Sequence, residues 1–214
     1  MKIFIPIKEN SQRVPRKNFR ELSGVPLYKH TLYKLTDYDV YVDTDSDEII
    51  EGIGNDHKLS NVTVFKRSQN LIGDRVSVCN LIKDFIISKE ISHGFVCQMH
   101  VTSPFITNDI LERASDHLQN HDSVVSCNKL NTRFWRKENY GYVPINHNPM
   151  KLEQLQDLPT YYEENSAFYM FDVEMFKKTN TRIGLNPYFY PIGFPENLDI
   201  DTEHDWEVVV GVSK

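Results

Sequence analysis

Three features of the sequence predict an α/β protein whose central sheet is mostly parallel and carries helices on both faces. Short apolar runs alternate with segments in which apolar residues recur at helical spacing, the pattern of right-handed strand–helix–strand units. A length of 214 residues suits one domain. A hydrophobic content of 40 % is enough for a substantial buried core.

The first half of the chain supplies most of the expected sheet. We expect strands at residues 3–7, 39–44, 62–65 and 95–99. Pro26 suits the first turn of the first helix, and Ser46 can cap the second. Asp74 or Ser77 can cap the third helix, whose apolar face begins at Val78.

The second half continues the alternation with one interruption. Thr107 can cap a fourth helix, and Thr202 can cap a last helix that runs through Val209. Between about 128 and 164, prolines and a turn at Gly141 replace the periodic pattern, so we expect an insertion that contains a hairpin. The remaining expected elements are strands around 124–125, 165–171 and 188–192 and a short helix at 173–177.

Charge and cysteine content argue against several classes of function. The formal net charge of −6 disfavours a nucleic-acid-binding surface, which would be basic. Cys79, Cys97 and Cys127 are odd in number and widely spaced, which is typical of reduced thiols rather than of disulfides or a zinc site. We expect no secretory signal and no membrane-spanning stretch, hence a cytoplasmic protein with no nucleic-acid and no membrane partner.

The loop that follows the first strand predicts an anionic ligand. Parallel strands bring their carboxyl ends to one edge of the sheet, where backbone N–H groups, Lys and Arg can bind phosphate. The loop lacks both common glycine-rich phosphate motifs, and a solvated basic patch is the alternative interpretation. Between positions 8 and 20 it has one acidic residue and five basic residues, Lys8, Arg13, Arg16, Lys17 and Arg20.

The segment Asp199-Ile200-Asp201, before the last helix, is a second candidate site, in this case for a metal ion. Residues i and i+2 of an extended segment point to the same side, so both carboxylates can reach one Mg²⁺ ion. This ion commonly binds one or two carboxylates together with substrate phosphates. The alternative is that both aspartates only mark the start of a helix, where acidic residues are common.

Longer motifs include both candidate sites, the opening loop and the segment at 199–201. Near the amino terminus the chain has Ile5-Pro6, Asn10-Ser11, Pro15-x-Lys17-Asn18 and Gly24-x-Pro26-Leu27. Together with the Asp-x-Asp-Thr element at 199–202, they resemble the acylneuraminate cytidylyltransferase family, the CMP-sialic acid synthetases and their relatives. The resemblance implies a single Rossmann-like nucleotidyltransferase domain over 1–214. It also implies a homodimer, in which the segment at about 128–164 is a dimerisation and acceptor insertion.

The resemblance further implies a CTP-dependent reaction, in which an acidic 2-keto-3-deoxy sugar attacks the α-phosphorus of CTP and pyrophosphate leaves. Lys17 and Asp201 are then the expected catalytic residues, and Asp199 and Asp201 the expected ligands of Mg²⁺. For Arg67, a surface arginine at a strand end is the alternative to a phosphate contact. The expected nucleotide-binding residues are Lys8, Asn10, Ser11, Arg13, Lys17, Asn18, Arg67, Asp74 and Ser77.

The acceptor-binding residues that the resemblance implies lie at the ends of two strands. They are His100, Thr102, Ser103, Asn165 and Tyr169. Residues 100–104 resemble the family's Gln-x-Thr-Ser-Pro element, but His100 replaces the glutamine. Residues 165–169 resemble its Asn-Gly-x-x-Tyr strand, but Ser166 replaces the glycine.

Three arginines that bacterial sialic acid enzymes of this family carry are absent, since Ile106, Gln156 and Glu163 stand at their positions. We therefore expect an altered acceptor, such as a diamino nonulosonic acid, an octulosonic acid or a different anion. A nucleotidyltransferase for another acceptor such as a phosphonate, and a non-catalytic nucleotide-binding homologue, remain as alternatives. Candidates for compensating charge are Arg133, Arg136 and Lys151.

Overall fold

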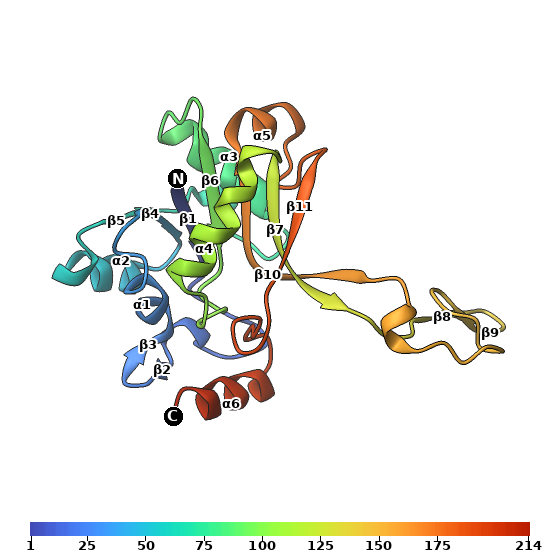
Figure 1. The fold of residues 1–214 in the computed structure, drawn as a ribbon. Coiled ribbons are helices and arrows are strands. Elements are labelled where there is room, and N and C mark those ends of the chain that lie inside the picture. Colours follow the sequence, from blue (N-terminus) through green and yellow to red (C-terminus); the bar gives the residue numbers. More distant parts are fainter.

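Seven strands form the central sheet in the order β11-β7-β10-β6-β1-β4-β5 (Figure 1). They belong to a computed structural model that describes residues 1–214. The sheet strands are β1 (Lys2–Ile7), β4 (Asp39–Thr44), β5 (Val62–Lys66), β6 (Phe95–Met99), β7 (Ser123–Leu130), β10 (Tyr161–Asp172) and β11 (Pro187–Pro191). Only β10 runs antiparallel to its neighbours, β6 and β7. The prediction of a mostly parallel sheet is therefore confirmed.

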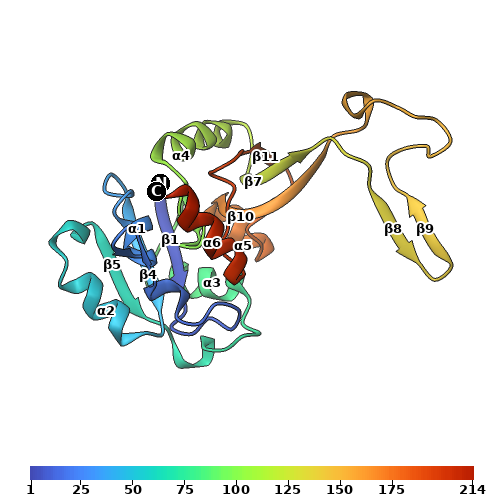
Figure 2. The same ribbon diagram turned by 90° about the horizontal axis from the view of Figure 1, so that it is seen from below.

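Helices cover both faces of the sheet, as predicted. They are α1 (Leu27–Leu32), α2 (Asp47–Gly54), α3 (Val78–Ser88), α4 (Asn108–Ser115), α5 (Val173–Thr179) and α6 (Glu203–Val212). Side chains of β1 alternate between the faces: Ile3 and Ile5 pack in one cluster with α1, α2 and α4, whereas Phe4 stacks on Phe85 of α3. Figures 1 and 2 accordingly show α3 and α4 on opposite sides of the sheet.

Short elements connect these layers. The strands β2 (Glu21–Leu22) and β3 (Val25–Pro26) form a small hairpin before α1 that the sequence did not predict. The 3-10 helices are η1 (Lys17–Phe19), η2 (His57–Leu59), η3 (Gln69–Leu71), η4 (Asp116–Gln119) and η5 (Leu155–Asp157). None of the helices is long and apolar enough to span a membrane.

Most of the predicted helix caps are confirmed. Ser77 accepts a hydrogen bond from the third helix, Thr107 caps α4, and Thr202 forms a capping box with Asp205 at α6. Ser46 is an exception, because its hydroxyl is buried and makes no capping hydrogen bond. Pro26 lies in β3 and precedes the first turn of α1 instead of occupying it.

The segment 128–164, which we call the arm, is more regular than predicted. β7 continues into it and β10 begins in it, with Leu130 paired to Tyr161. The expected hairpin is formed by β8 (Trp135–Glu138) and β9 (Gly141–Pro144), and Figures 1 and 2 show it projecting away from the body. The strand residues within the arm are mostly exposed, so they lack the alternation of apolar and polar residues that marks a half-buried strand.

Candidate active site

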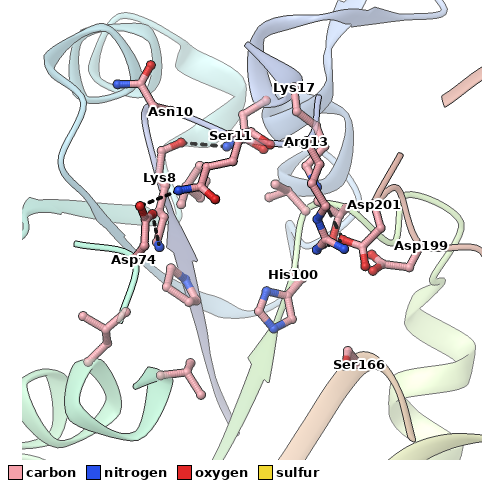
Figure 3. Close-up of a pocket in the computed structure, with 18 of the residues that line it drawn as sticks. Lys8, Asn10, Ser11, Arg13, Lys17, Asp74, His100, Ser166, Asp199 and Asp201 are labelled. Carbon is pink, nitrogen blue, oxygen red and sulfur yellow. Dashed lines mark hydrogen bonds and ion pairs between the residues drawn. The ribbon is translucent and has the colours of Figure 1, made fainter. Parts of the chain in front are cut away.

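The carboxyl edge of β1 and β6 borders a cavity of about 510 Å³ (Figure 3). Segments far apart in the sequence meet there: the opening loop, the start of α3, the end of β6 and the residues before α6. The cavity therefore brings together most of the residues that the sequence analysis singled out. Those that line it are Lys8, Asn10, Ser11, Arg13, Lys17, Asn18, Asp74, His100, Thr102, Asp199 and Asp201.

One side of the cavity is formed by Lys8 at the end of β1. Its Nζ donates to the Gly73 carbonyl at 3.2 Å and lies 3.5 Å from the Asp74 carboxylate. The same carboxylate accepts a 2.6 Å hydrogen bond from Gln12, a residue that the sequence analysis missed. Asn18 donates its amide to the Lys8 carbonyl at 2.8 Å, so the opening loop is held to β1 and to the segment before α3.

Two cations of the opening loop meet the carboxylate of Asp201 (Figure 3). Arg13 Nη2 lies 2.7 Å from Asp201 Oδ1, and Lys17 Nζ lies 3.9 Å from the same oxygen. Lys17 is only 9 % exposed and also donates to the Ile200 carbonyl. Its burial lowers the pKa of the ammonium, while the carboxylates of Asp199 and Asp201 oppose that shift. The loop and the acidic segment therefore form one charged cluster.

The two aspartates face the cavity, and the residue between them faces the core. Ile200 is fully buried, and its N–H donates to the Thr102 carbonyl at 2.9 Å. Ser103 donates to Asp199 Oδ1 at 3.3 Å. Burial raises the pKa of Asp199, while hydrogen bonds from Thr102 and Ser103 and the charge of Lys17 oppose the shift.

No group of three His, Cys, Asp or Glu side chains is placed to hold a metal ion. Asp199 and Asp201 both present carboxylate oxygens to the cavity. A donor set of two carboxylates fits Mg²⁺, which takes its other ligands from substrate phosphates and water. It would not suit a structural zinc site, which needs four protein ligands.

His100 follows β6 and points into the cavity (Figure 3). Its Nε2 lies 3.0 Å from the amide nitrogen of Gln98. Burial lowers the pKa of His100 to about 4, and the charges of Arg182 and Lys17 add to the shift. The imidazole is therefore neutral near pH 7 and suited to hydrogen bonding.

With this geometry established, comparison with known proteins identifies the family. A sequence model described as "Cytidylyltransferase" matches residues 3–206. The chain belongs to the cytidylyltransferase family.

The names of curated relatives specify different sugar acids. The N-acylneuraminate cytidylyltransferase of Streptococcus agalactiae is 28 % identical over 97 % of this chain and 52 % of its own length. The CMP-N,N'-diacetyllegionaminic acid synthase of Legionella pneumophila is 28 % identical over 94 % of this chain and 91 % of its own length. The pseudaminic acid cytidylyltransferase of Campylobacter jejuni is 25 % identical over 95 % of this chain and 91 % of its own length. The chain spans about half the length of the streptococcal relative.

Solved structures show that the fold is that of Rossmann-like nucleotidyltransferases. A CMP:2-keto-3-deoxy-manno-octonic acid synthetase complexed with CTP has a TM-score of 0.66 and 13 % identity, over 98 % of this chain and 96 % of that one. A 4-diphosphocytidyl-2C-methyl-D-erythritol synthase has a TM-score of 0.69 and 11 % identity, over 100 % of this chain and 98 % of that one. The predicted family and fold class are both confirmed.

Arg67, which was predicted to contact phosphate, does not line the cavity. Arg67 is buried, and its Nε donates to Asp43 Oδ1 at 2.9 Å. Its Nη2 donates to the carbonyls of Asp43 and Ile7 at 3.1 and 3.4 Å. The guanidinium therefore holds the ends of β1 and β4 together and does not line the cavity; the alternative of a surface arginine is equally wrong. Burial raises the pKa of Asp43, against the opposing charge of Arg67.

Four other predicted residues make contacts outside the cavity lining. Ser77 caps α3, and Ser103 orients Asp199. Asn165 donates to the Asn128 side chain at 3.2 Å, and the Tyr169 hydroxyl donates to Glu164 at 2.8 Å. None of the four lines the cavity.

Ser166 lines the cavity, although the sequence analysis did not name it as a site residue. Its φ of 61° lies in the left-handed region, which glycine adopts without strain. The register of β10 against β7 shifts at this point, between Glu164 and Tyr169. The replacement of the family's glycine by Ser166 was the signal that could have identified it.

Proposed function

We propose that the chain is a CTP-dependent cytidylyltransferase, which transfers CMP to an acidic 2-keto-3-deoxy sugar and releases pyrophosphate. The observation that carries the proposal is the shared cavity, in which cations of the opening loop lie beside Asp199 and Asp201. The names of the relatives support it, because each describes activation of such an acid with a cytidine nucleotide or as a CMP-sugar.

In the proposed reaction the anomeric hydroxyl of the sugar attacks the α-phosphorus of CTP. Lys8, Arg13 and Lys17 bind the triphosphate, and Lys17 stabilises the departing pyrophosphate because its charge is buried and already in place. Arg13 exchanges Asp201 for phosphate oxygens when CTP enters. Asp199 and Asp201 would hold Mg²⁺, which when bound would neutralise phosphate charge.

The other side of the cavity binds the acceptor sugar. His100 is neutral near pH 7 because burial lowers its pKa, so it offers a hydrogen bond and no charge. Ser166 and the backbone around Thr102 complete this side. Proton removal from the sugar hydroxyl is not assigned to His100, since a pKa of about 4 makes it a weak base at neutral pH.

We propose that the acceptor is an acid other than N-acetylneuraminate. Ile106 is 4 % exposed and belongs to the hydrophobic core, and Glu163 accepts a hydrogen bond from Asn128 on the arm. Neither position offers the cation that sialic acid enzymes carry there. A diamino nonulosonic or octulosonic acid is the expected substrate class.

We also propose that the arm packs against a second copy to form a homodimer. Its apolar side chains are unusually exposed, with Met150 and Leu152 each 92 % exposed and Tyr142 67 % exposed. Such a cluster is typical of an interaction surface. Light scattering should give the mass of a dimer for the wild type and of a monomer for a Tyr142→Ser, Leu152→Ser variant; a monomeric wild type would contradict the proposal.

Pyrophosphate release from CTP and Mg²⁺ across a panel of 2-keto sugar acids tests the proposed function, with ATP, GTP and UTP as controls. Release with CTP and one acid would support the reaction and name the substrate. Efficient use of N-acetylneuraminate would overturn the altered acceptor. If CTP does not bind at all, the assignment of the opening loop is wrong.

A further inference from the structure

Arg182, in the segment between α5 and β11, is a partly buried cation without a carboxylate partner. None of the ion pairs in the structure includes it. Its Nη1 donates to the side-chain oxygen of Gln98, and its guanidinium carbon lies 3.5 Å from the centroid of the Tyr169 ring. The other donors make no hydrogen bond within the protein, and none is buried without a partner, so they face accessible space.

Two residues that line the cavity, His100 and Ser166, are each linked to Arg182 through one further residue. His100 Nε2 lies 3.0 Å from the amide nitrogen of Gln98, which is fully buried and whose oxygen receives the guanidinium. Ser166 Oγ lies 3.4 Å from the hydroxyl of Tyr169, whose ring stacks on the guanidinium. Arg182 therefore lies next to the part of the cavity that His100 and Ser166 line, one residue away from each. Its charge also reaches His100, where it adds to the effect of burial on the pKa.

The guanidinium is held in place by neutral groups alone. The Gln98 side chain is itself fixed by a 3.1 Å hydrogen bond to the Met99 carbonyl, and the Tyr169 ring gives a cation–π contact. Glu164 on β10 accepts a hydrogen bond from the Tyr169 hydroxyl and makes no ion pair with Arg182. Arg182 is therefore a partly buried positive charge beside the cavity with no protein anion against it.

A carboxylate is the anion that fits this position. The guanidinium fork binds a carboxylate through two parallel hydrogen bonds. The cations that would bind the triphosphate lie in the opening loop, which leaves Arg182 for the other substrate. We propose that Arg182 binds the carboxylate of the acceptor and replaces the arginines that are absent at Ile106, Gln156 and Glu163. This rests on the proposed function, since it presupposes an acidic acceptor.

The other candidates for compensating charge are already engaged within the arm. Arg136 pairs with Glu138, Lys151 lies 3.5 Å from Glu153, and Arg133 donates to a backbone carbonyl. None of the three, and none of the groups that they contact, hydrogen-bonds to a side chain that lines the cavity. Arg182 is thus the cation beside the acceptor side that no protein anion neutralises.

The test compares an acid acceptor with its carboxamide, using the 2-keto sugar acid that gives the fastest pyrophosphate release. In Arg182→Gln, kcat/KM for the acid should fall about 30-fold or more, while kcat/KM for the carboxamide and the affinity for CTP should change less than about threefold. Arg182→Lys should recover part of the acid activity. Arg113→Gln, an exposed change on α4, serves as the control and should leave both substrates unchanged.

A merely structural role would lower kcat/KM for the acid and the carboxamide equally, and that result would overturn the assignment. So would an Arg182→Gln enzyme that uses the acid as well as the wild type. If the wild type binds CTP but accepts no acid, the proposed acceptor class fails and this assignment fails with it. Thermal unfolding of each variant, followed by circular dichroism, confirms that the comparison is made on folded protein.

Discussion

The two walls of the cavity differ in how their charges are neutralised. The wall proposed for the nucleotide, which we call the nucleotide wall, carries cations paired with carboxylates: Lys8 with Asp74, and Arg13 and Lys17 with Asp201. The wall proposed for the acceptor, which we call the acceptor wall, is lined by the neutral side chains of His100 and Ser166 and has one unpaired cation, Arg182, beside it. A wall of exchangeable ion pairs suits a polyphosphate that enters with a metal ion, whereas a single fixed cation suits the recognition of one carboxylate.

Beneath the nucleotide wall, the buried pair of Arg67 and Asp43 should contribute the largest stability effect. Arg67→Met leaves an uncompensated carboxylate among buried groups, so the free energy of unfolding should fall by about 3 to 5 kcal/mol in urea titrations. Arg113→Met removes an exposed pair and should cost less than about 1 kcal/mol. Equal losses in the two variants would mean that the buried pair does not anchor the ends of β1 and β4.

Within the nucleotide wall, the charged cluster should dominate turnover. Lys17→Ala and Asp201→Asn should each lower kcat by about 100-fold or more, because each removes a preorganised charge at the phosphates. Asp109→Asn, on the exposed face of α4, should have no effect. A folded Asp201→Asn enzyme with near-normal turnover would remove the metal assignment.

On the acceptor wall, His100 should make stability depend on pH. Burial lowers its pKa to about 4 from an ordinary value of 6.5, so between these values the unfolded chain binds a proton that the folded chain does not. Stability attributable to His100 is therefore lost as the pH falls from about 6.5 to about 4. His100→Gln should abolish this part of the loss, on the order of 2 kcal/mol between pH 7 and pH 4.5 in urea titrations. Parallel pH profiles for the two proteins would contradict this.

The smallest expected effect is at Ser166, where the acceptor wall contains a left-handed residue. Ser166→Gly should raise the free energy of unfolding by about 0.5 kcal/mol, because relief of backbone strain exceeds the added entropy of the unfolded chain. Ser60→Gly is the matched control, because Ser60 has an ordinary φ of −62°. This substitution should lower the free energy of unfolding by a similar amount. A loss at both positions would show that Ser166 is not strained.

The same contrast explains what could be predicted from the sequence. The nucleotide wall was predictable because the opening loop and the Asp-x-Asp element are contiguous, and because β1, β4 and β6 are buried runs whose carboxyl ends must meet at one edge. Arg67 was misassigned because its partner, Asp43, is 24 residues away on the neighbouring strand. Sequence order alone could not reveal that pair.

The acceptor wall was less predictable, because it is assembled from distant segments. Arg182 lies 84 residues from Gln98, and no motif marks it. The antiparallel course of β10 was also missed, since the exposed strands of the arm, and not a helix, connect it to β7. Exposed strands bury no face and so leave no periodic signal in the sequence.

The separation of the two walls is tested most directly by measuring KM for CTP and for the acid acceptor in Lys8→Gln and Arg182→Gln. Lys8→Gln should raise KM for CTP and leave KM for the acid within about twofold, and Arg182→Gln should do the reverse. If both variants raise the two KM values together, the cavity acts as one undivided site, and the assignment of one substrate to each wall is wrong.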